Sequence, residues 1–92
     1  MIKSFKHKGL EHYFVRNVKR LLDARDLLKI KRILDRLDAA VMVKDMNIPG
    51  WGLHELKGHR KGYFSVTVRA NWRITFKFEY DEVYDVNLED YH

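Results

Sequence analysis

Polar and apolar residues alternate along two consecutive stretches of the chain, Tyr63–Arg69 and Arg73–Phe78. Side chains of a β-strand point to opposite faces with a period of two, so this alternation predicts two strands with one apolar face each. The three residues between them predict a short turn, because Asn71 tolerates the positive φ that such a turn often requires. The shared apolar face contains Phe64, Val66, Val68, Ile74, Phe76 and Phe78.

The opposite face of this strand pair is polar and basic. If the apolar residues of both strands share one core, Val68 lies beside Ile74 and an odd-numbered loop sets Arg69 opposite Arg73. Guanidinium groups directly across a strand pair repel each other, and a shared anionic ligand would offset that cost. The sequence therefore predicts an anion-binding face that contains Tyr63, Ser65, Thr67, Arg69, Arg73, Thr75 and Lys77.

Apolar residues at steps of three and four predict two helices in the first half of the chain. The first begins at about Gly9 and presents Leu10, Phe14, Val18 and Leu21 or Leu22. The second begins near a capping Asp23 or Asp26 and presents Leu27, Ile30, Leu34, Leu37 and Val41. This second stripe is expected to cover one face of the sheet.

Two more strands are predicted at residues 2–5 and 51–57, and a last one follows the central pair. The order strand, helix, helix, four strands predicts an α+β fold in a single domain over residues 1–92. Its two N-terminal helices would pack on one face of a mostly antiparallel four- to five-stranded sheet. The other face would stay partly open.

The last strand is predicted to alternate through Tyr84, Val86 and Leu88. Pairing it with the preceding strand through Phe78 opposite Tyr84 brings Asp85 to Lys77. In the same register Glu89 meets Arg73, so the end of the chain returns to the basic face.

Composition narrows the class of partner. The net charge of +5 and the pI near 9.6 favour nucleic acid or another polyanion. The chain has no cysteine, which excludes disulfides and thiolate chemistry, and its histidines are dispersed, so we expect no metal and no cofactor. No apolar run has the length of a signal peptide or a membrane span, so we expect a cytoplasmic protein without a membrane partner.

Cleavage of RNA by its own ribose 2′-hydroxyl needs a base, cations for the charged phosphorane and an acid for the leaving 5′-oxygen. The chain offers candidates for each role. The cations are Lys57, Arg69 and Arg73, and the proton carriers are His54, Asp90, Tyr91 and His92. Further candidate RNA contacts are Arg60, Lys61, Tyr63 and Lys77.

Structural roles compete with this chemistry at two positions. Arg73 could form a salt bridge with Glu89 or Asp90, since paired charges are common on sheets. A five-residue loop before Tyr63 would turn His54 toward the core as a hydrogen-bonded histidine, whereas a bulge or an even-numbered loop would turn it outward. The negative charge of the terminal carboxylate would favour the imidazolium form of the His92 side chain, if the C-terminus is ordered.

Several segments carry a specific pattern. They read Leu53-His54-x-Leu56-Lys57-Gly58-x-Arg60-x-Gly62, then Ser65-Val66-x-Val68-Arg69-x-Asn71-Trp72-Arg73-Ile74-Thr75-Phe76, then Glu89-Asp90-Tyr91-His92, with Met1-Ile2-Lys3-Ser4-Phe5-x-His7-Lys8-Gly9-Leu10 at the start. Together they closely resemble the HigB toxins of the RelE/ParE superfamily, and the similarity spans the whole chain.

The resemblance implies a RelE-like fold and a type II toxin that enters the ribosomal A site, contacts ribosomal RNA and cleaves translated mRNA without a metal. It also implies a HigA-like helix-turn-helix antitoxin, through which operator DNA would be contacted only indirectly. The family's functional positions match at His54, Lys57, Arg69, Arg73, Asp90, Tyr91 and His92. The basic members would hold the scissile phosphate and the others would move protons, with acid and base not divided among them.

Two other functions fit the same basic face. ParE-like relatives on this fold block DNA gyrase without cutting RNA, and fold alone does not distinguish them. A general RNA-binding domain would instead bind free RNA tightly, with a steep salt dependence.

Overall fold

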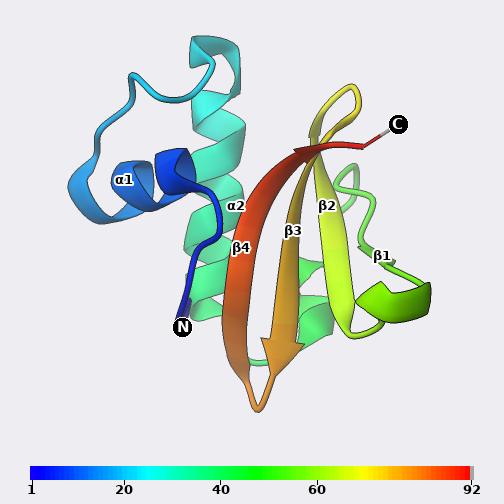
Figure 1. Cartoon of the computed structure of the whole chain (residues 1–92). Coiled ribbons are helices and arrows are strands. Elements are labelled where there is room, and N and C mark those ends of the chain that lie inside the picture. The colour runs from blue at the N-terminus through cyan, green and yellow to red at the C-terminus, as the bar shows by residue number, and fades with distance from the viewer. Residues whose placement is uncertain (92) are drawn as a thin grey trace.

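The structure of the protein, a computed structural model, describes residues 1–91. Its centre is a four-stranded antiparallel sheet with the strand order β1-β2-β3-β4 (Figure 1). The strands are β1 His54–Glu55, β2 Tyr63–Arg69, β3 Trp72–Glu79 and β4 Glu82–Asp90. The two N-terminal helices lie on one side of this sheet, which confirms the predicted α+β architecture (Figure 1).

The first helix, α1 (Lys8–Arg16), is shorter than the sequence predicts. His7 caps its start by accepting a hydrogen bond from the Leu10 N–H through Nδ1, and Asn17 ends it in the left-handed conformation with φ of 56°. Asn tolerates this conformation because its short polar side chain can bond locally. Val18 and Leu21 therefore lie in the connection that follows, not on a helix.

The second helix, α2 (Leu27–Ala39), follows a short 3₁₀ turn, η1 (Ala24–Asp26). Asp23 caps this turn by accepting a hydrogen bond from the Arg25 N–H, as a capping aspartate does. The helix ends before Val41, whose side chain is 60% exposed, so the predicted stripe is one residue too long at that end. Further 3₁₀ turns are η2 (Val43–Met46) and η3 (Gly58–Arg60).

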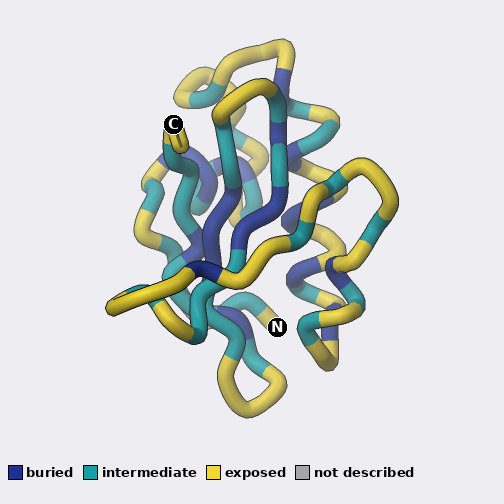
Figure 2. The backbone as a smooth tube through the Cα atoms, turned by 90° about the vertical axis from the view of Figure 1, so that its right-hand side faces the viewer, coloured by how far each residue is buried: buried dark blue, intermediate teal, exposed yellow. Residues whose placement is uncertain are grey.

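The core lies between α2 and the apolar face of the sheet. The helix contributes Ile30, Ile33, Leu34 and Leu37, all buried, and each such side chain contributes about 1.5–3 kcal/mol on removal from water. The sheet contributes Val66, Val68, Ile74, Phe76, Val83 and Val86, with Phe64, Phe78 and Leu88 packed around them. Figure 2 shows the buried positions in the middle of the strands and the exposed ones in the turns.

The register of β2 and β3 differs from the prediction. Val66 pairs with Ile74 and Thr67 with Arg73, and the register shifts between Thr67 and Arg69. The extra residue, Val68, is a β-bulge that keeps its side chain in the core but turns the strand end. Arg69 is thus not opposite Arg73, and the predicted arginine pair is wrong.

The last two strands also contain a bulge. Lys77 pairs with Tyr84 and Thr75 with Asn87, so an extra residue of β4 lies between them. Asp85 takes the left-handed conformation there, with φ of 57°. The predicted pairs of Phe78 with Tyr84 and of Asp85 with Lys77 are wrong, and Tyr84 faces the open side instead of the core.

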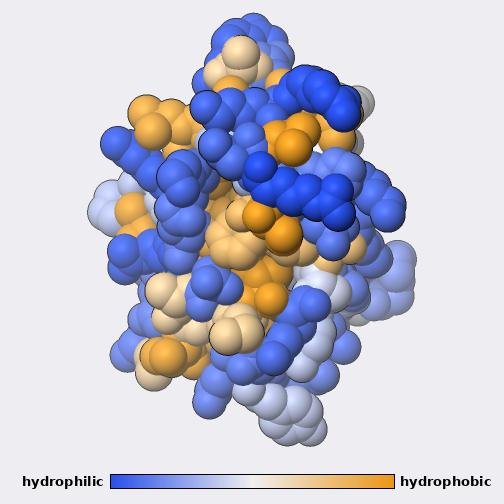
Figure 3. All heavy atoms as spheres, turned by 90° about the vertical axis from the view of Figure 1, so that its left-hand side faces the viewer, coloured by the Kyte–Doolittle hydropathy of each residue, from blue (hydrophilic) through white to orange (hydrophobic). Residues whose placement is uncertain are grey.

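The predicted strand at residues 2–5 forms only isolated parallel bridges, of Ile2 with Val83 and of Phe5 with Val86, which cover the first part of the β4 edge. Seen from the left-hand side of Figure 1, apolar side chains form a band at the surface of the molecule (Figure 3). Among the described residues, no helix combines the length and hydrophobicity needed to cross a membrane.

Candidate functional site

The sheet face turned away from α2 presents three rows of side chains across the strands. One row contains Thr67, Arg73 and Glu89, the next contains His54, Ser65, Thr75 and Asn87, and the third contains Tyr63, Lys77 and Tyr84. We call this surface the open face. Neighbouring strands lie about 4.8 Å apart, so His54 on β1 and Arg73 on β3 are on the order of 10 Å apart across the sheet.

His54 is on the open face and exposed, which is the outward of the two orientations that the sequence left open. It pairs with Ser65, one residue away from the register that the five-residue loop would have given. The neighbouring hydrogen bond runs from the Leu56 N–H to the Tyr63 carbonyl at 2.8 Å. Leu56 is buried but separate from the main core, beneath the loop that carries η3.

Arg60 reaches across the open face and forms a bidentate ion pair with Glu89. Its Nη1 and Nη2 atoms donate to the two carboxylate oxygens at 3.1 and 2.6 Å, and the Thr75 hydroxyl donates to the same carboxylate at 2.5 Å. Hydrogen bonds from Arg60 chiefly, and from Thr75, lower the pKa of Glu89, while burial opposes the shift. Arg60, predicted as an RNA contact, is thus held within the protein.

Arg73 lies next to this pair but is not part of it. Register sets it opposite Glu89, as predicted, yet its Nη1 atom donates to the Ala70 carbonyl at 2.8 Å. Glu89 pairs with Arg60 instead of Arg73. The Arg73 guanidinium is therefore not neutralised by the carboxylate that faces it across the strands.

The end of the chain is docked beside Arg73 as far as Tyr91. The Tyr91 N–H donates to the Asn71 carbonyl at 2.8 Å, so the residue after β4 is tied to the turn between β2 and β3. The pKa of Arg60 is raised chiefly by its hydrogen bonds to Glu89, with smaller electrostatic contributions that include Tyr91 and Tyr63. Both phenols therefore lie close enough to influence this guanidinium.

Arg69 lies on the opposite side of the sheet. Its guanidinium donates to the Asp26 carboxylate at 2.7 and 3.2 Å, and Asp23 is 3.7 Å away. These contacts, the hydrogen bonds to Asp26 first, raise the pKa of Arg69. Of the predicted site residues, Arg69 is the one that the structure separates most clearly from the open face.

The remaining predicted residues differ in where they lie. Lys57 is exposed and directly precedes η3, and Lys61 is exposed just after it. Tyr63 donates its hydroxyl to Asp85 at 2.7 Å, and Lys77 lies 3.5 Å from Glu79. Asp90 pairs with Trp72, which places it one step beyond Glu89 on the helix side, and His92 lies outside the described residues.

Comparison with known proteins shows the family of the chain. A family model described as the RelE-like toxin of the type II toxin-antitoxin system HigB matches residues 3–92. The chain belongs to this family. It is also 49% identical, over the full length of both chains, to a protein of Proteus vulgaris named endoribonuclease HigB.

The fold of the toxin has a counterpart among solved structures. The YoeB dimer of Staphylococcus aureus matches with a TM-score of 0.61 and 19% identity, over 99% of this chain and 94% of that one. At this level of identity the likeness concerns the fold, and it agrees with helices on one side of an antiparallel sheet.

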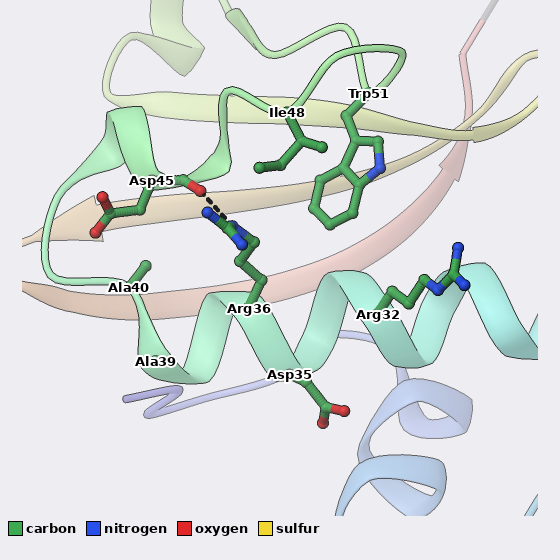
Figure 4. A pocket seen from close by; sticks show the side chains of 8 residues that line it. All are labelled: Arg32, Asp35, Arg36, Ala39, Ala40, Asp45, Ile48 and Trp51. Carbon is green, nitrogen blue, oxygen red and sulfur yellow. Dashed lines mark hydrogen bonds between the residues drawn. The ribbon is translucent and has the colours of Figure 1, made fainter.

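The toxin also has a hollow that is separate from the open face. It lies between α2 and the segment that leads to Trp51, and its rim includes Arg32 and Arg36 (Figure 4). The Arg36 Nε atom donates to the Asp45 carbonyl at 2.6 Å across it.

Among residues 1–91, no group of three or more His, Asp or Glu residues is placed to hold a metal ion.

Three carboxylates that shape the site were missed as such by the sequence reasoning. Glu89 accepts hydrogen bonds from Arg60, Asp26 accepts them from Arg69, and Asp85 accepts one from Tyr63. Each partner pair is separated by more than 20 residues, so local spacing gives no sign of it. Residues 79–92 contain acidic residues but no Lys or Arg, whereas the rest of the chain is basic. This charge asymmetry is the pattern that pointed toward the pairs of Glu89 and Asp85.

Proposed function

We propose that the toxin is a ribosome-dependent endoribonuclease that cleaves translated mRNA in the ribosomal A site without a metal. The ribose 2′-oxygen would attack the adjacent phosphorus while the bond to the 5′-oxygen breaks, leaving a 2′,3′-cyclic phosphate and a 5′-hydroxyl. The name of the Proteus vulgaris relative supports RNA cleavage over a block of DNA gyrase.

The observation that carries the proposal is the setting of Arg73. The Arg73 guanidinium lies on the open face, one strand from the docked end of the chain, and the facing Glu89 does not hold it. An arginine suits a phosphate, because its planar donors match phosphate oxygens. Glu89, the candidate competitor, is already neutralised by Arg60.

The roles divide between charge and proton transfer. Arg73 and Lys57 would stabilise the charge that develops on the phosphorane. His54 and Tyr91 on the open face, with His92 at the chain end, would take the proton of the 2′-hydroxyl and protonate the leaving 5′-oxygen. Asp90 would have only an indirect part, because its register with Trp72 places it on the helix side. Arg69 has no direct part in this proposal, because Asp26 holds it on the other side of the sheet.

Partners follow from the family. A type II toxin has a cognate antitoxin, which we propose is a HigA-like helix-turn-helix protein that contacts operator DNA on behalf of the pair. The basic body of the toxin would meet ribosomal RNA, with Lys61 and Lys77 among the contacts, in the cytoplasm. Arg60 would contribute there only if RNA displaced it from Glu89.

Variants of single residues test the proposal in a translating extract, with cleavage mapped by primer extension. Arg73→Ala is expected to slow cleavage by about 10²–10³-fold, the usual cost of one lost donor to a developing anion. Lys57→Ala and a chain lacking Tyr91 and His92 should also be impaired. The matched controls are Arg16→Ala at the exposed end of α1 and Lys3→Ala near the N-terminus.

Equal cleavage by Arg73→Ala, the truncated chain and the controls would contradict the site assignment. Absence of cleavage by the wild type, with DNA damage in expressing cells instead of translation arrest, would favour a ParE-like toxin. Cleavage of free RNA at the same rate as ribosome-bound mRNA would contradict ribosome dependence.

A further inference from the structure

The Asp26–Arg69 pair joins two parts of the fold that are far apart in sequence. Asp26 is 6% exposed at the junction of η1 and α2, and both of its carboxylate oxygens accept hydrogen bonds from the Arg69 guanidinium. This pair sits in a hollow that is also lined by Leu22, Trp72 and Leu88. The start of α2 is thereby fastened to the last residue of β2.

The turn directly after Arg69 carries both contacts that define the open-face site. Its two residues are Ala70, whose carbonyl accepts from Arg73, and Asn71, whose carbonyl accepts from the Tyr91 N–H. The position of Arg73 and that of the chain end therefore both depend on this turn. It is connected to the helical layer through Arg69.

The turn is not a low-energy shape for its residues. Ala70 has a φ of 51°, in the left-handed region that a residue with a Cβ atom disfavours. Such a conformation persists where surrounding contacts impose it, and its cost is of order 1–3 kcal/mol. The bulge at Val68 adds a further irregularity just before it.

We propose that Asp26 is a positioning residue for RNA cleavage, which acts by fixing the β2–β3 turn through Arg69. This inference rests on the proposed function. Asp26 touches no substrate, and its effect runs through Arg69 to Ala70 and Asn71 and so to the groups of the open face. Charge-assisted, bidentate hydrogen bonds are strong and directional, so this pair is suited to fixing the position of the β2–β3 turn.

The size of the effect follows from the sensitivity of catalysis to geometry. Displacement of reacting groups by about 1 Å can cost roughly 10²-fold in rate. We therefore expect Asp26→Asn, which keeps the shape but loses the charge, to lower kcat by about 10- to 100-fold with a smaller change in KM. Arg69→Lys, which keeps the charge but not the two-pronged geometry, should fall between this variant and the wild type.

The matched control is Asp45→Asn. The Asp45 carboxylate accepts hydrogen bonds from the Val41 and Met42 N–H groups at 3.0 and 3.2 Å, so it too is a structural carboxylate. It has no contact with the β2–β3 turn. A loss of charge that merely lowered stability would affect both variants, whereas a positioning role affects only Asp26→Asn.

Two readouts decide the question. Kinetics on programmed ribosomes give kcat and KM, and hydrogen exchange gives the protection of the Tyr91 N–H, measured where the Phe76 N–H in the middle of β3 keeps its wild-type protection. We expect Tyr91 to exchange at least several-fold faster in Asp26→Asn and unchanged in Asp45→Asn. The exchange readout needs no activity.

Unchanged Tyr91 exchange in Asp26→Asn overturns the inference. So does faster exchange with an unchanged kcat, because the turn would then be free to move without cost to the chemistry. A wild-type protein that cleaves no ribosome-bound mRNA overturns the proposed function itself. The exchange result then still tests whether the Asp26–Arg69 pair fixes the β2–β3 turn.

Discussion

At the scale of single residues, the site depends on which acidic group neutralises which arginine. Glu89 faces Arg73 in the register of the sheet, yet its carboxylate is occupied by Arg60 and Thr75. Arg73 is therefore not neutralised by the glutamate that faces it. Sequence could name both arginines but not which of them Glu89 would hold.

The Glu89 carboxylate should make stability depend on pH. Its pKa is lowered in the folded protein from an ordinary value of 4.5, so its stabilising effect is fully present above about pH 4.5 and is lost as pH falls through the lower, folded-state pKa. The difference in unfolding free energy between wild type and Glu89→Gln should therefore shrink on acidification from pH 6 toward pH 3.

Urea unfolding of the two proteins across this pH range measures the effect. A gap between them that stays constant down to pH 3 would show that the carboxylate charge adds nothing to the fold. Arg60→Gln should reproduce the narrowing, because it removes the other half of the same pair.

At the scale of elements, the sequence was informative about strands and weak about their ends. Alternation located β2 and β3 and their apolar face, since a period of two is a property of the extended chain. It could not reveal the bulges at Val68 and Asp85. Each bulge inserts one residue, so the side chains beyond it point to the opposite face of the sheet from the one predicted. Arg69 and Tyr84 were misplaced for this reason alone.

The orientation of His54 could not be decided from sequence for the same kind of reason. The loop before β2 contains η3, and the pairing of β1 with β2 is set one residue away from the expected register. Loop length alone does not determine register where a 3₁₀ turn takes up part of the loop. The predicted hairpin loop of five residues assumed a regular path for the chain.

The start of α1 gives a testable consequence of close packing. A Cβ atom at Gly9 would lie 2.8 Å from Cε1 of His7, the residue that caps the helix through Nδ1. Gly9→Ala must therefore displace the ring, and loss of a cap costs about 0.5–2 kcal/mol. We expect it to lower the melting temperature, although Ala normally favours a helix.

Thermal unfolding with Lys8→Ala as the control checks this expectation. Lys8 is exposed at the adjacent position and its replacement leaves the capping contact intact. A melting temperature for Gly9→Ala equal to or above that of the control would mean that His7 moves aside without cost.

At the scale of the whole molecule, the fold separates two tasks. The helices and the inner face of the sheet supply stability, and the other face presents the residues that we propose act in RNA cleavage on a frame of paired strands. The N-terminal segment covers the first part of the β4 edge through its bridges, which protects that part from pairing with another chain. The net charge of +5 gives the body an attraction for nucleic acid that is independent of sequence.

The general charge does not by itself distinguish a nuclease from an RNA-binding domain. That distinction lies in the chemistry of the open face, where RNA would be cut by its own 2′-hydroxyl. The reaction leaves an end group that hydrolysis with a metal-bound water would not leave. The product therefore reports the mechanism directly.

The most direct test is end-group analysis of mRNA incubated with purified toxin on ribosomes programmed with a defined codon in the A site. The account predicts cleavage at that codon, with a 2′,3′-cyclic phosphate and a 5′-hydroxyl, and strongly reduced product with Arg73→Ala. A 3′-hydroxyl with a 5′-phosphate, or the same yield from Arg73→Ala as from wild type, would contradict it.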